Sequence, residues 1–308
     1  MRKIILDLQQ LFLLSISIIL IATVPSFIAD QNRINFSILR YVESVLEVLT
    51  TLIRPDSLTL YIHSQNMILE PMPVNISYKF VNEIYEKPLF PEIWNIVFYT
   101  LSMLLISFAA AFIIAVFLGW IAELLPASFK TAALRISEIL EAFPDLFFVF
   151  CIQLAVVWIY KKTGFLAANP FTSSKEPSFL LPVITLSIVP AIYLFRMQLT
   201  LSQAEIEKDY ITFARSKGLA NSQIVFHHLL KNTLRELSIH LPYIMLLLFS
   251  HLIILEYLFN MNGIIQILLS EQPAETRAML LMLIAFPLFA AVKGVRMFIK
   301  KERISNAA

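Results

Sequence analysis

The sequence contains few of the residues that build soluble domains, disulfides or nucleotide sites. Charged residues make up 15% of the 308 residues, whereas soluble domains usually carry about a quarter. The single cysteine, Cys151, excludes an intrachain disulfide and a cysteine-based metal cluster. The five glycines are scattered singly. No G-x-x-x-x-G-K-[ST] phosphate loop occurs, so the chain has no such motif for hydrolysing ATP itself.

The polar residues show no motif for catalysis or for nucleic-acid binding. No G-x-S-x-G or H-E-x-x-H motif occurs, which leaves no hydrolase signature. The 24 Lys and Arg residues stand against 22 Asp and Glu residues, and they are not concentrated in one stretch. We therefore predict a non-catalytic chain that binds no nucleic acid, no metal ion and no cofactor of its own.

Long apolar runs are the abundant feature of the sequence. Hydrophobic residues make up 58% of the chain and the mean hydropathy is +0.75. A helix needs about 20 mostly apolar residues to cross a bilayer. We predict an all-α membrane protein whose six transmembrane helices lie at about 8–29, 94–120, 139–160, 179–199, 240–259 and 278–299. A cleaved signal peptide is the alternative for the first run, but its length and the lack of a small-x-small cleavage site favour an uncleaved helix.

Basic residues between the runs predict the orientation of the helices. Most Lys and Arg residues of the short connecting segments fall on one side of the membrane, together with both termini. Short cytoplasmic segments are the ones enriched in basic residues, so we predict that both termini are cytoplasmic. The predicted parts are an N-terminal transmembrane helix, an extracellular segment, a five-helix core with an inner loop at 200–239, and a cytoplasmic tail, at 1–29, 30–93, 94–299 and 300–308 respectively.

Part of the predicted extracellular segment has helical periodicity. Apolar residues between Ile34 and Ile53 recur every three or four positions, while Arg40, Glu43 and Glu47 lie off that stripe. The stretch is too interrupted to span a membrane. We predict an amphipathic helix that lies on the bilayer surface or on the helix bundle.

The inner loop at 200–239 is too polar to span a membrane and has the pattern of two short helices. Ile211 and Ala214 mark the first helix. Gly218 is its predicted end, because glycine adopts the left-handed conformation that stops a helix without steric cost. Asn221 is the predicted cap of the second helix, since an asparagine side chain can accept a hydrogen bond from an early backbone N–H.

The second short helix has one predicted apolar face and one polar face. The apolar face is formed by Ile224, Val225, Leu229, Leu230 and Leu234. A helix, a glycine turn and a second helix at the inner membrane surface suit a cytoplasmic partner, and a solvated connector is the alternative.

The run DYITFARSKGL, from Asp209 to Leu219, closely resembles a known motif. It is similar to the EAA loop of permeases in the dipeptide, oligopeptide and nickel ABC importer family, approximately D-Y-[IV]-x-x-A-[RK]-[AS]-K-G. In that family a basic helix follows, as His227–Asn232 does here. The resemblance implies that the loop couples the chain to an ATPase through Asp209, Tyr210, Ala214, Arg215, Lys217, Gly218 and Leu219.

The resemblance extends from about residue 94, with some departures. Thr163–Leu166, Leu181–Leu186 and Glu256–Ile264 look like the family's outer loop, its leucine-proline helix entry and its outer turn. Asn262 replaces the usual proline, the arginine-aspartate pair expected after Gly263 is absent, and the C-terminal region lacks the aspartate-proline-arginine ending. The first 93 residues match in layout only.

The resemblance implies a type I ABC importer permease fold in the bacterial cytoplasmic membrane. The chain would form the translocation pathway with a second permease, above two cytoplasmic ATPase subunits that use ATP. An extracellular substrate-binding protein would deliver the cargo, with oligopeptides as the first expectation and nickel or metal chelates as the alternative. An ion-coupled secondary transporter is the alternative outside this family, although the sequence shows neither clear repeats nor broken helices.

Four ionisable residues in or near the predicted spans are candidates for the pathway or a gate. Such residues are costly in a bilayer unless they are paired. Glu141 and Asp145 fall in the inner half of the predicted third span, and Glu256 falls near the outer end of the fifth. His251 is the fourth candidate, with core packing as its alternative. Structural hydrogen bonds or the inner interface are the alternatives for the carboxylates.

Overall fold

The computed structural model describes residues 2–305 apart from 31–32, 35, 72–75, 167, 170–171, 173–177 and 262. The chain divides into two compact units, and each is treated by itself. The first unit contains residues 1–100 and 262–287, and the second contains residues 101–261 and 288–308. Two long helices, α4 (Ile93–Leu124) and α13 (Ala274–Ser305), contribute to both units.

Six helical segments of the described chain are long and apolar enough to cross a membrane, as the sequence predicts. They lie at Ile5–Ala22, Ile93–Leu124, Asp145–Thr163, Leu180–Ile206, Asn221–Leu258 and Ala274–Val295. The number of spans is therefore confirmed. The bounds of every span differ somewhat from the predicted ones, most of all at the start of the fifth, and the third begins at Asp145 instead of 139.

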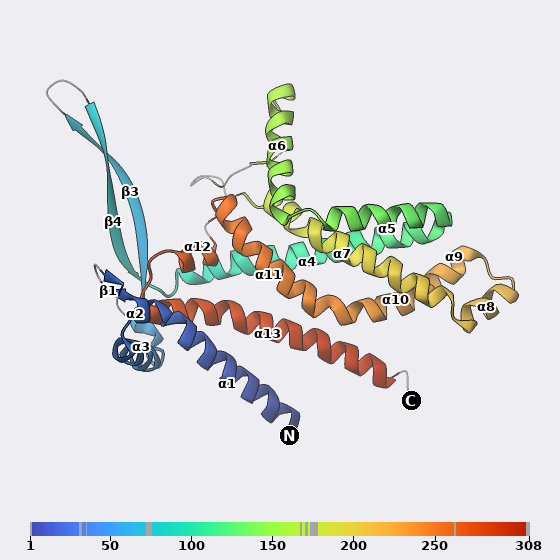
Figure 1. The fold of residues 1–308 in the computed structure, drawn as a ribbon, viewed down its shortest axis with the longest axis horizontal. Helices are drawn as coiled ribbons and strands as arrows, with labels where there is room; N and C mark the ends of the chain where they lie inside the picture. Colours follow the sequence, from blue (N-terminus) through green and yellow to red (C-terminus); the bar gives the residue numbers. More distant parts are fainter. Residues whose placement is uncertain are drawn as a thin grey trace. The chain divides into compact units, whose positions relative to one another are not determined.

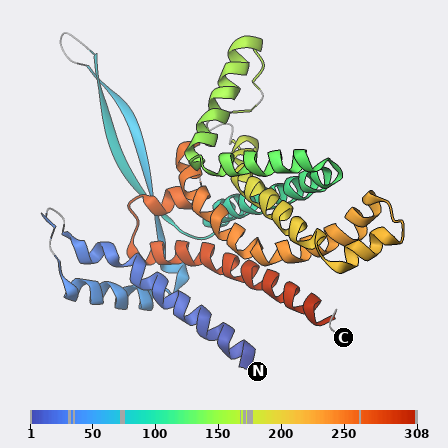
Figure 2. The same ribbon diagram turned by 45° about the vertical axis from the view of Figure 1, so that its right-hand side comes forward.

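The first unit contains the first helix and the segment that follows it (Figures 1 and 2). Its helices are α1 (Arg2–Ala22), α2 (Val24–Ile28), α3 (Ile38–Thr51), α12 (Ile264–Leu269) and the first part of α13. A short 3-10 turn, η1 (Pro55–Ser57), and strands β1 (Ala29–Asp30), β2 (Arg33–Ile34), β3 (Thr59–Pro71) and β4 (Ile76–Pro88) complete it. The helix α3 confirms the amphipathic helix predicted between 34 and 53.

A long β-hairpin follows α3, and the sequence analysis did not predict it. The antiparallel strands β3 and β4 pair from Thr59 opposite Pro88 to Pro71 opposite Ile76. Gln272 holds the base of the hairpin, because its side chain accepts from the backbone N–H of Tyr61 at 2.9 Å and donates to the backbone oxygen of Tyr61 at 2.7 Å. The hydroxyl of Thr276 donates to the backbone oxygen of Thr59 at 2.6 Å. The hairpin base is therefore attached to the beginning of α13.

The second unit is built around α7 (Leu180–Ile206). Its other helices are α5 (Ala127–Glu141), α6 (Asp145–Thr163), α8 (Asp209–Ser216), α9 (Asn221–Ile224), α10 (Leu230–Leu237), α11 (Leu241–Leu258) and parts of α4 and α13. A π-helical turn, η2 (Val225–Leu229), and a 3-10 turn, η3 (Ser238–His240), join α9, α10 and α11. The helices α5, α6, α10 and α11 all contact α7 (Figure 1). Most helices of this unit therefore pack against α7.

Two contacts show that α4 and α7 run side by side in the same direction. The hydroxyl of Ser107 donates to the backbone oxygen of Val183 at 3.4 Å, and Gln198 lies against Gly119 further along both helices. A Cβ atom on Gly119 would come within 2.5 Å of the Gln198 side chain. Glycine thus permits the close approach, which is a common use of small residues between membrane helices.

The third predicted span, 139–160, begins later than expected. The chain turns sharply at Pro144, which separates α5 from α6 (Figures 1 and 2). Proline lacks a backbone N–H and restricts the residue before it, so a helix tends to end there. The apolar helix is α6, and Glu141 is the last residue of α5.

Candidate functional site

The predicted pair of short helices is present, and glycine ends the first of them. In α8, the buried residues Ile211 and Ala214 pack against Ile224 of α9 and beside Tyr210. Gly218 follows with φ of 77°, a left-handed conformation that favours glycine. The backbone N–H of Gly218 donates to the oxygen of Arg215 at 2.9 Å, which caps the helix end. The predicted role of Gly218 as a helix stop is confirmed.

The predicted cap of the second helix is wrong by one residue. Asn221 is the first residue of α9, and Ala220 occupies the cap position. The side-chain oxygen of Gln223 accepts from the backbone N–H of Ala220 at 3.2 Å. A glutamine three residues beyond the cap therefore satisfies the helix start, as in half of a capping box.

The second helix is longer than predicted and continues into the fifth span. Ile224, Val225 and Leu229 are buried, as the predicted apolar face requires. The π-helical turn η2 adds a residue to one turn of the helix, and such turns are frequent at functional sites. Helical structure then runs through α10 and η3 into α11. The loop and the span are therefore one helical segment.

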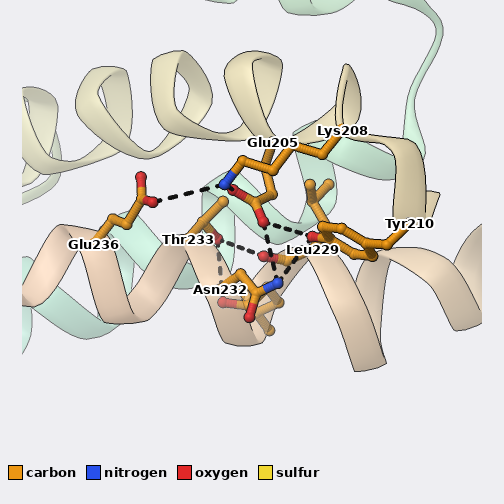
Figure 3. Close-up of polar contacts among 8 residues, drawn as sticks. Glu205, Lys208, Tyr210, Leu229, Asn232, Thr233 and Glu236 are labelled. Atoms are coloured by element: carbon orange, nitrogen blue, oxygen red, sulfur yellow. Dashed lines mark hydrogen bonds and ion pairs between the residues drawn. The ribbon is translucent and has the colours of Figure 1, made fainter. Parts of the chain in front are cut away.

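A buried carboxylate of α7 bonds to side chains of α8 and α10 (Figure 3). Glu205, near the end of α7, is 3% exposed. Its Oε1 accepts from the phenolic hydroxyl of Tyr210 at 2.6 Å and from the side-chain amide of Asn232 at 3.1 Å. The amide of Asn232 also donates to the Tyr210 oxygen at 2.8 Å. We call Glu205, Lys208, Tyr210 and Asn232 the Glu205 network.

Lys208 completes the network from the turn between α7 and α8. Its ammonium group bonds to Oε2 of Glu205 and lies 3.9 Å from a carboxylate oxygen of Glu236 on α10. The Glu205 network therefore connects α7, α8 and α10, and each oxygen of the buried carboxylate has a donor. Buried charges are tolerated when they are paired and hydrogen-bonded in this way.

The pKa shifts around Glu205 keep its donors protonated. Burial, followed by hydrogen bonding to Glu205, raises the pKa of Tyr210 to about 12. The hydrogen bond to Glu205 raises the pKa of Lys208 above its ordinary value. The stabilisation from a raised lysine pKa is complete below the unfolded pKa and is lost only as the pH rises through the folded pKa. Both groups therefore donate to Glu205 throughout the physiological pH range.

The solvent-exposed face of α8 and of the turn that follows it mixes apolar with basic side chains. Phe213 is 60% exposed and Leu219 is 38% exposed. The ammonium of Lys217 lies 4.4 Å from the centre of the Phe213 ring, a cation–π contact. The candidate residues thus fall into two groups: Tyr210 and Ala214 hold the helix from inside, and Asp209, Arg215, Lys217, Gly218 and Leu219 are exposed.

Sequence reasoning missed three members of the Glu205 network. Glu205 and Lys208 lie outside the family motif quoted from the sequence, and Asn232 was quoted only as the last residue of the basic helix that follows it, without a role. A carboxylate three residues before a lysine at the end of an apolar run is a local signal for a pair. Nothing local indicates that Asn232, 27 residues after Glu205, reaches the same carboxylate.

Two of the four pathway candidates form a pair. Asp145 is the first residue of α6, and its Oδ2 lies 2.6 Å from Nε2 of His251 on α11. The Asp145 side chain is 40% exposed, whereas that of His251 is 12% exposed. The pair connects α6 to α11 and leaves part of the Asp145 carboxylate accessible.

Glu141 forms a different pair, and its predicted place within the third span is wrong. Pro144 separates Glu141 from α6, as described above. Nε and Nη2 of Arg196 on α7 bind its two carboxylate oxygens, each at 2.8 Å. A two-point contact of this kind is the strong form of an arginine–carboxylate pair. The pair attaches the end of α5 to α7.

The pair between Glu141 and Arg196 yields a testable expectation. Replacing Arg196 by leucine leaves the Glu141 carboxylate without its partner, and the loss of such a charged hydrogen bond costs about 1.5–3 kcal/mol. We expect the double variant with Glu141→Leu and Arg196→Leu to lose less stability than the two single variants added together. Thermal unfolding of the four proteins in lipid nanodiscs measures this. Strictly additive losses would show that the two residues do not interact.

Glu256 is fully buried in the last turn of α11. Its backbone oxygen accepts from the N–H of Met261 at 2.9 Å, which closes the turn after the helix. Asn260 adopts a positive φ of 49° in this turn. Asn262, the predicted departure from the family pattern, lies outside the described residues. Glu256 therefore lies at a helix end whose backbone turn is hydrogen-bonded.

Comparison with known proteins identifies the family. Residues 115–293 match the binding-protein-dependent transport system inner membrane component family. The chain is 24% identical over 213 residues to the metal-staphylopine import system permease protein CntB of Staphylococcus aureus, covering 68% of this chain and 64% of that protein. The chain thus spans less than two thirds of that relative.

Shorter stretches match dipeptide permeases. Identity is 35% over 83 residues with the di/tripeptide transport system permease protein DppB of Pseudomonas aeruginosa, covering 25% of each chain. It is 31% over 114 residues with the dipeptide transport system permease protein DppB of Haemophilus influenzae, covering 35% of this chain and 34% of that one. The family match covers more than half of this chain and includes the helix pair α8–α9 and the Glu205 network. The chain belongs to the family of binding-protein-dependent transport system inner membrane components, and it is a multi-pass membrane protein of the type I ABC importer permease fold.

Proposed function

We propose that this chain is a transmembrane permease subunit of an ABC importer and that it takes up energy through α8 and α9. The observation that carries the proposal is the combination of an exposed, mixed apolar and basic face on α8 with the buried Glu205 network behind it. An exposed surface that is supported from behind by buried hydrogen bonds suits docking into a groove of another protein. In this proposal Asp209, Arg215, Lys217 and Leu219 face the ATPase.

The proposed mechanism is a rigid-body displacement. The Glu205 network connects α8 to the end of α7, and α10 continues into α11. When two ATPase subunits close on ATP, the docked helix pair moves and tilts α7 and α11 together. A tilt of packed helices as rigid elements is an established way of switching between two states. This chain contributes no nucleotide chemistry and binds no cofactor in this proposal.

The orientation and the remaining partners are part of the same proposal. The basic residues of the short segments support a cytoplasmic location for both termini and for the loop of residues 200–239. Residues 30–93 then face the outside, where the hairpin β3–β4 is available to an extracellular substrate-binding protein. A second permease completes the pathway in the bacterial cytoplasmic membrane. The proposed five-helix core is 94–299, and 300–308 is a cytoplasmic tail.

The proposed cargo is a small peptide. Two of the relatives are dipeptide or di/tripeptide permeases by name, and the accessible carboxylate of Asp145 suits the ammonium group of a peptide. A metal chelate is the second candidate, because the relative with the longest match among these three is named as a metal-staphylopine permease. Asp145, His251 and Glu256 are proposed to line the pathway or its gate, whereas Arg196 neutralises Glu141.

Uptake by the reconstituted complex tests the proposal. The chain is co-expressed with the second permease, ATPase subunits and binding protein that co-purify with it, and the assembly is placed in proteoliposomes. We expect uptake of labelled peptides that needs ATP and the binding protein, is blocked by vanadate and persists without a proton gradient. Uptake that follows the proton gradient and ignores vanadate would instead identify an ion-coupled secondary transporter.

A further inference from the structure

The amphipathic helix α3 has three separate faces. Tyr41, Val45, Val48 and Leu52 recur every three or four residues on the face that packs against the protein. Arg40, Glu43 and Glu47 define the polar face. The third face is apolar and exposed, and it consists of Leu39, Val42, Leu46, Leu49 and Ile53, with Ile38 beside it.

The third face needs an explanation because it is extensive. Exposure of its side chains ranges from 45% at Leu49 to 79% at Ile53. The spacing of its members is three, four, three and four residues, so they form one continuous stripe along the helix. Contiguous apolar patches of this kind mark protein or membrane contacts. Packing within the protein explains the apolar residues of the packed face of α3, but it does not explain those of the third face.

The position of α3 in its unit is at the end of a membrane span. The hydroxyl of Tyr41 donates to the backbone oxygen of Leu20 at 3.0 Å, and Val48 packs against Ile19 and Ala22 at the end of α1. The same buried cluster includes Ala278, in the first turns of α13. The helix therefore lies where one span ends and another begins, which is the boundary between bilayer and water.

The direction of α3 agrees with this position. Figure 1 looks nearly along the axis of α3, whereas α1 and the first part of α13 lie across the view. A helix that crosses the ends of two spans in this way lies close to the membrane plane. The exposed apolar residues Leu20 and Ile21 near the end of α1 continue the apolar surface beside it.

We propose that α3 is an interfacial anchor whose stripe from Leu39 to Ile53 is buried among phospholipid acyl chains, while Glu43 and Glu47 face the water. An amphipathic helix in the interface plane places its apolar face at the boundary of headgroups and acyl chains. The polar face carries one arginine and two glutamates, so the anchor needs no anionic lipid. The anchor fixes the level at which the hairpin that follows α3 begins.

Collision accessibility of spin labels tests the anchor. Cys151 is replaced by serine, and single cysteines are introduced at Leu39, Leu46, Glu43 or Glu47 for nitroxide labelling of the full chain, assembled with its partner subunits in phospholipid bilayers. Oxygen collides with labels in the bilayer, whereas a water-soluble nickel chelate collides with labels in water. We expect the ratio of the oxygen to the nickel-chelate collision rate to be several-fold higher at Leu39→Cys and Leu46→Cys than at Glu43→Cys and Glu47→Cys. The same ratios are expected with and without anionic lipid.

The neighbouring positions 46 and 47 are matched controls for each other. Equal ratios at Leu46→Cys and Glu47→Cys would place the stripe in water and overturn the proposal. A label at Leu46→Cys that neither reagent reaches would show that another protein subunit covers the stripe, which also overturns it. The readout is depth in the bilayer and does not depend on transport, so its failure is distinct from failure of the importer function.

Discussion

Replacing Gly218 by valine is expected to abolish most of the cargo-stimulated ATP hydrolysis and uptake of the assembled importer. Gly218 has φ of 77°, and a left-handed residue with a side chain costs about 1–2 kcal/mol. The β-branched valine makes this conformation still less favourable. The contact between α8 and α9 consists of a few buried side chains, so the turn is expected to rearrange and change the angle between the helices. Uptake and ATP hydrolysis by proteoliposomes measure the effect.

Gly164 supplies a matched control in the same chain. It also has a positive φ, of 71°, and a Cβ atom would meet nothing within 4 Å at either glycine. Gly164→Val therefore carries a similar backbone strain at the end of α6, away from the proposed docking surface. We expect this variant to assemble and transport normally. If both variants lose activity alike, the loss reflects general destabilisation and the coupling role of Gly218 is refuted.

Replacing Glu205 by alanine is expected to have a second large effect on coupling. The variant removes the acceptor of Tyr210, Lys208 and Asn232 at once. Each hydrogen bond to a charged group contributes about 1.5–3 kcal/mol, and the tyrosine and asparagine would keep only their bond to each other. The helix α8 should then loosen from α7 while the spans stay folded. Faster backbone hydrogen exchange in 208–219, together with reduced uptake, measures this.

Glu207 is the matched control for Glu205. It lies two residues further along and is exposed, and it has no part in the Glu205 network. We expect Glu207→Ala to leave hydrogen exchange and uptake close to the values of the original protein. Normal exchange in α8 of Glu205→Ala would show that the carboxylate does not hold the helix.

The sequence was sufficient for features that have a local physical cause. Six apolar runs predicted six spans, since a bilayer sets the length of a helix. Gly218 could be predicted to end a helix, because a glycine after a helical pattern readily adopts the left-handed conformation that the structure shows there. The amphipathic helix α3 was found from its spacing alone.

Features that depend on distant residues were missed or misplaced. In β4, Ile76, Tyr78 and Phe80 alternate with Ser77 and Lys79, which is a local strand signal that the sequence analysis did not use; β3 shows no such alternation. The base of the hairpin is held by Gln272, which lies 211 residues after Tyr61. Pro144 divides what looked like one span, and the apolar pattern alone did not decide between a kink and a break.

In the candidate site, too, the residues with a local signal could be predicted and those with distant partners could not. The exposed residues of α8 follow from the family motif, which is contiguous in the sequence. The support behind them depends on Glu205 and Asn232, and these come together only when α10 folds back against α7. The partners of Asp145 and Glu141 are likewise 106 and 55 residues away in the chain, at His251 and Arg196. Pairing of such distant residues leaves no trace in a single sequence.

Site-specific photo-crosslinking tests most directly whether α8 receives the motion of an ATPase. The photoreactive amino acid p-benzoylphenylalanine replaces Phe213, which is 60% exposed on α8, or Phe12, which is 65% exposed on α1, in the assembled complex. The account predicts an adduct with the ATPase subunit at Phe213 whose yield changes when ATP binds, and none at Phe12. A transport-competent complex in which Phe213 forms no ATPase adduct would contradict it.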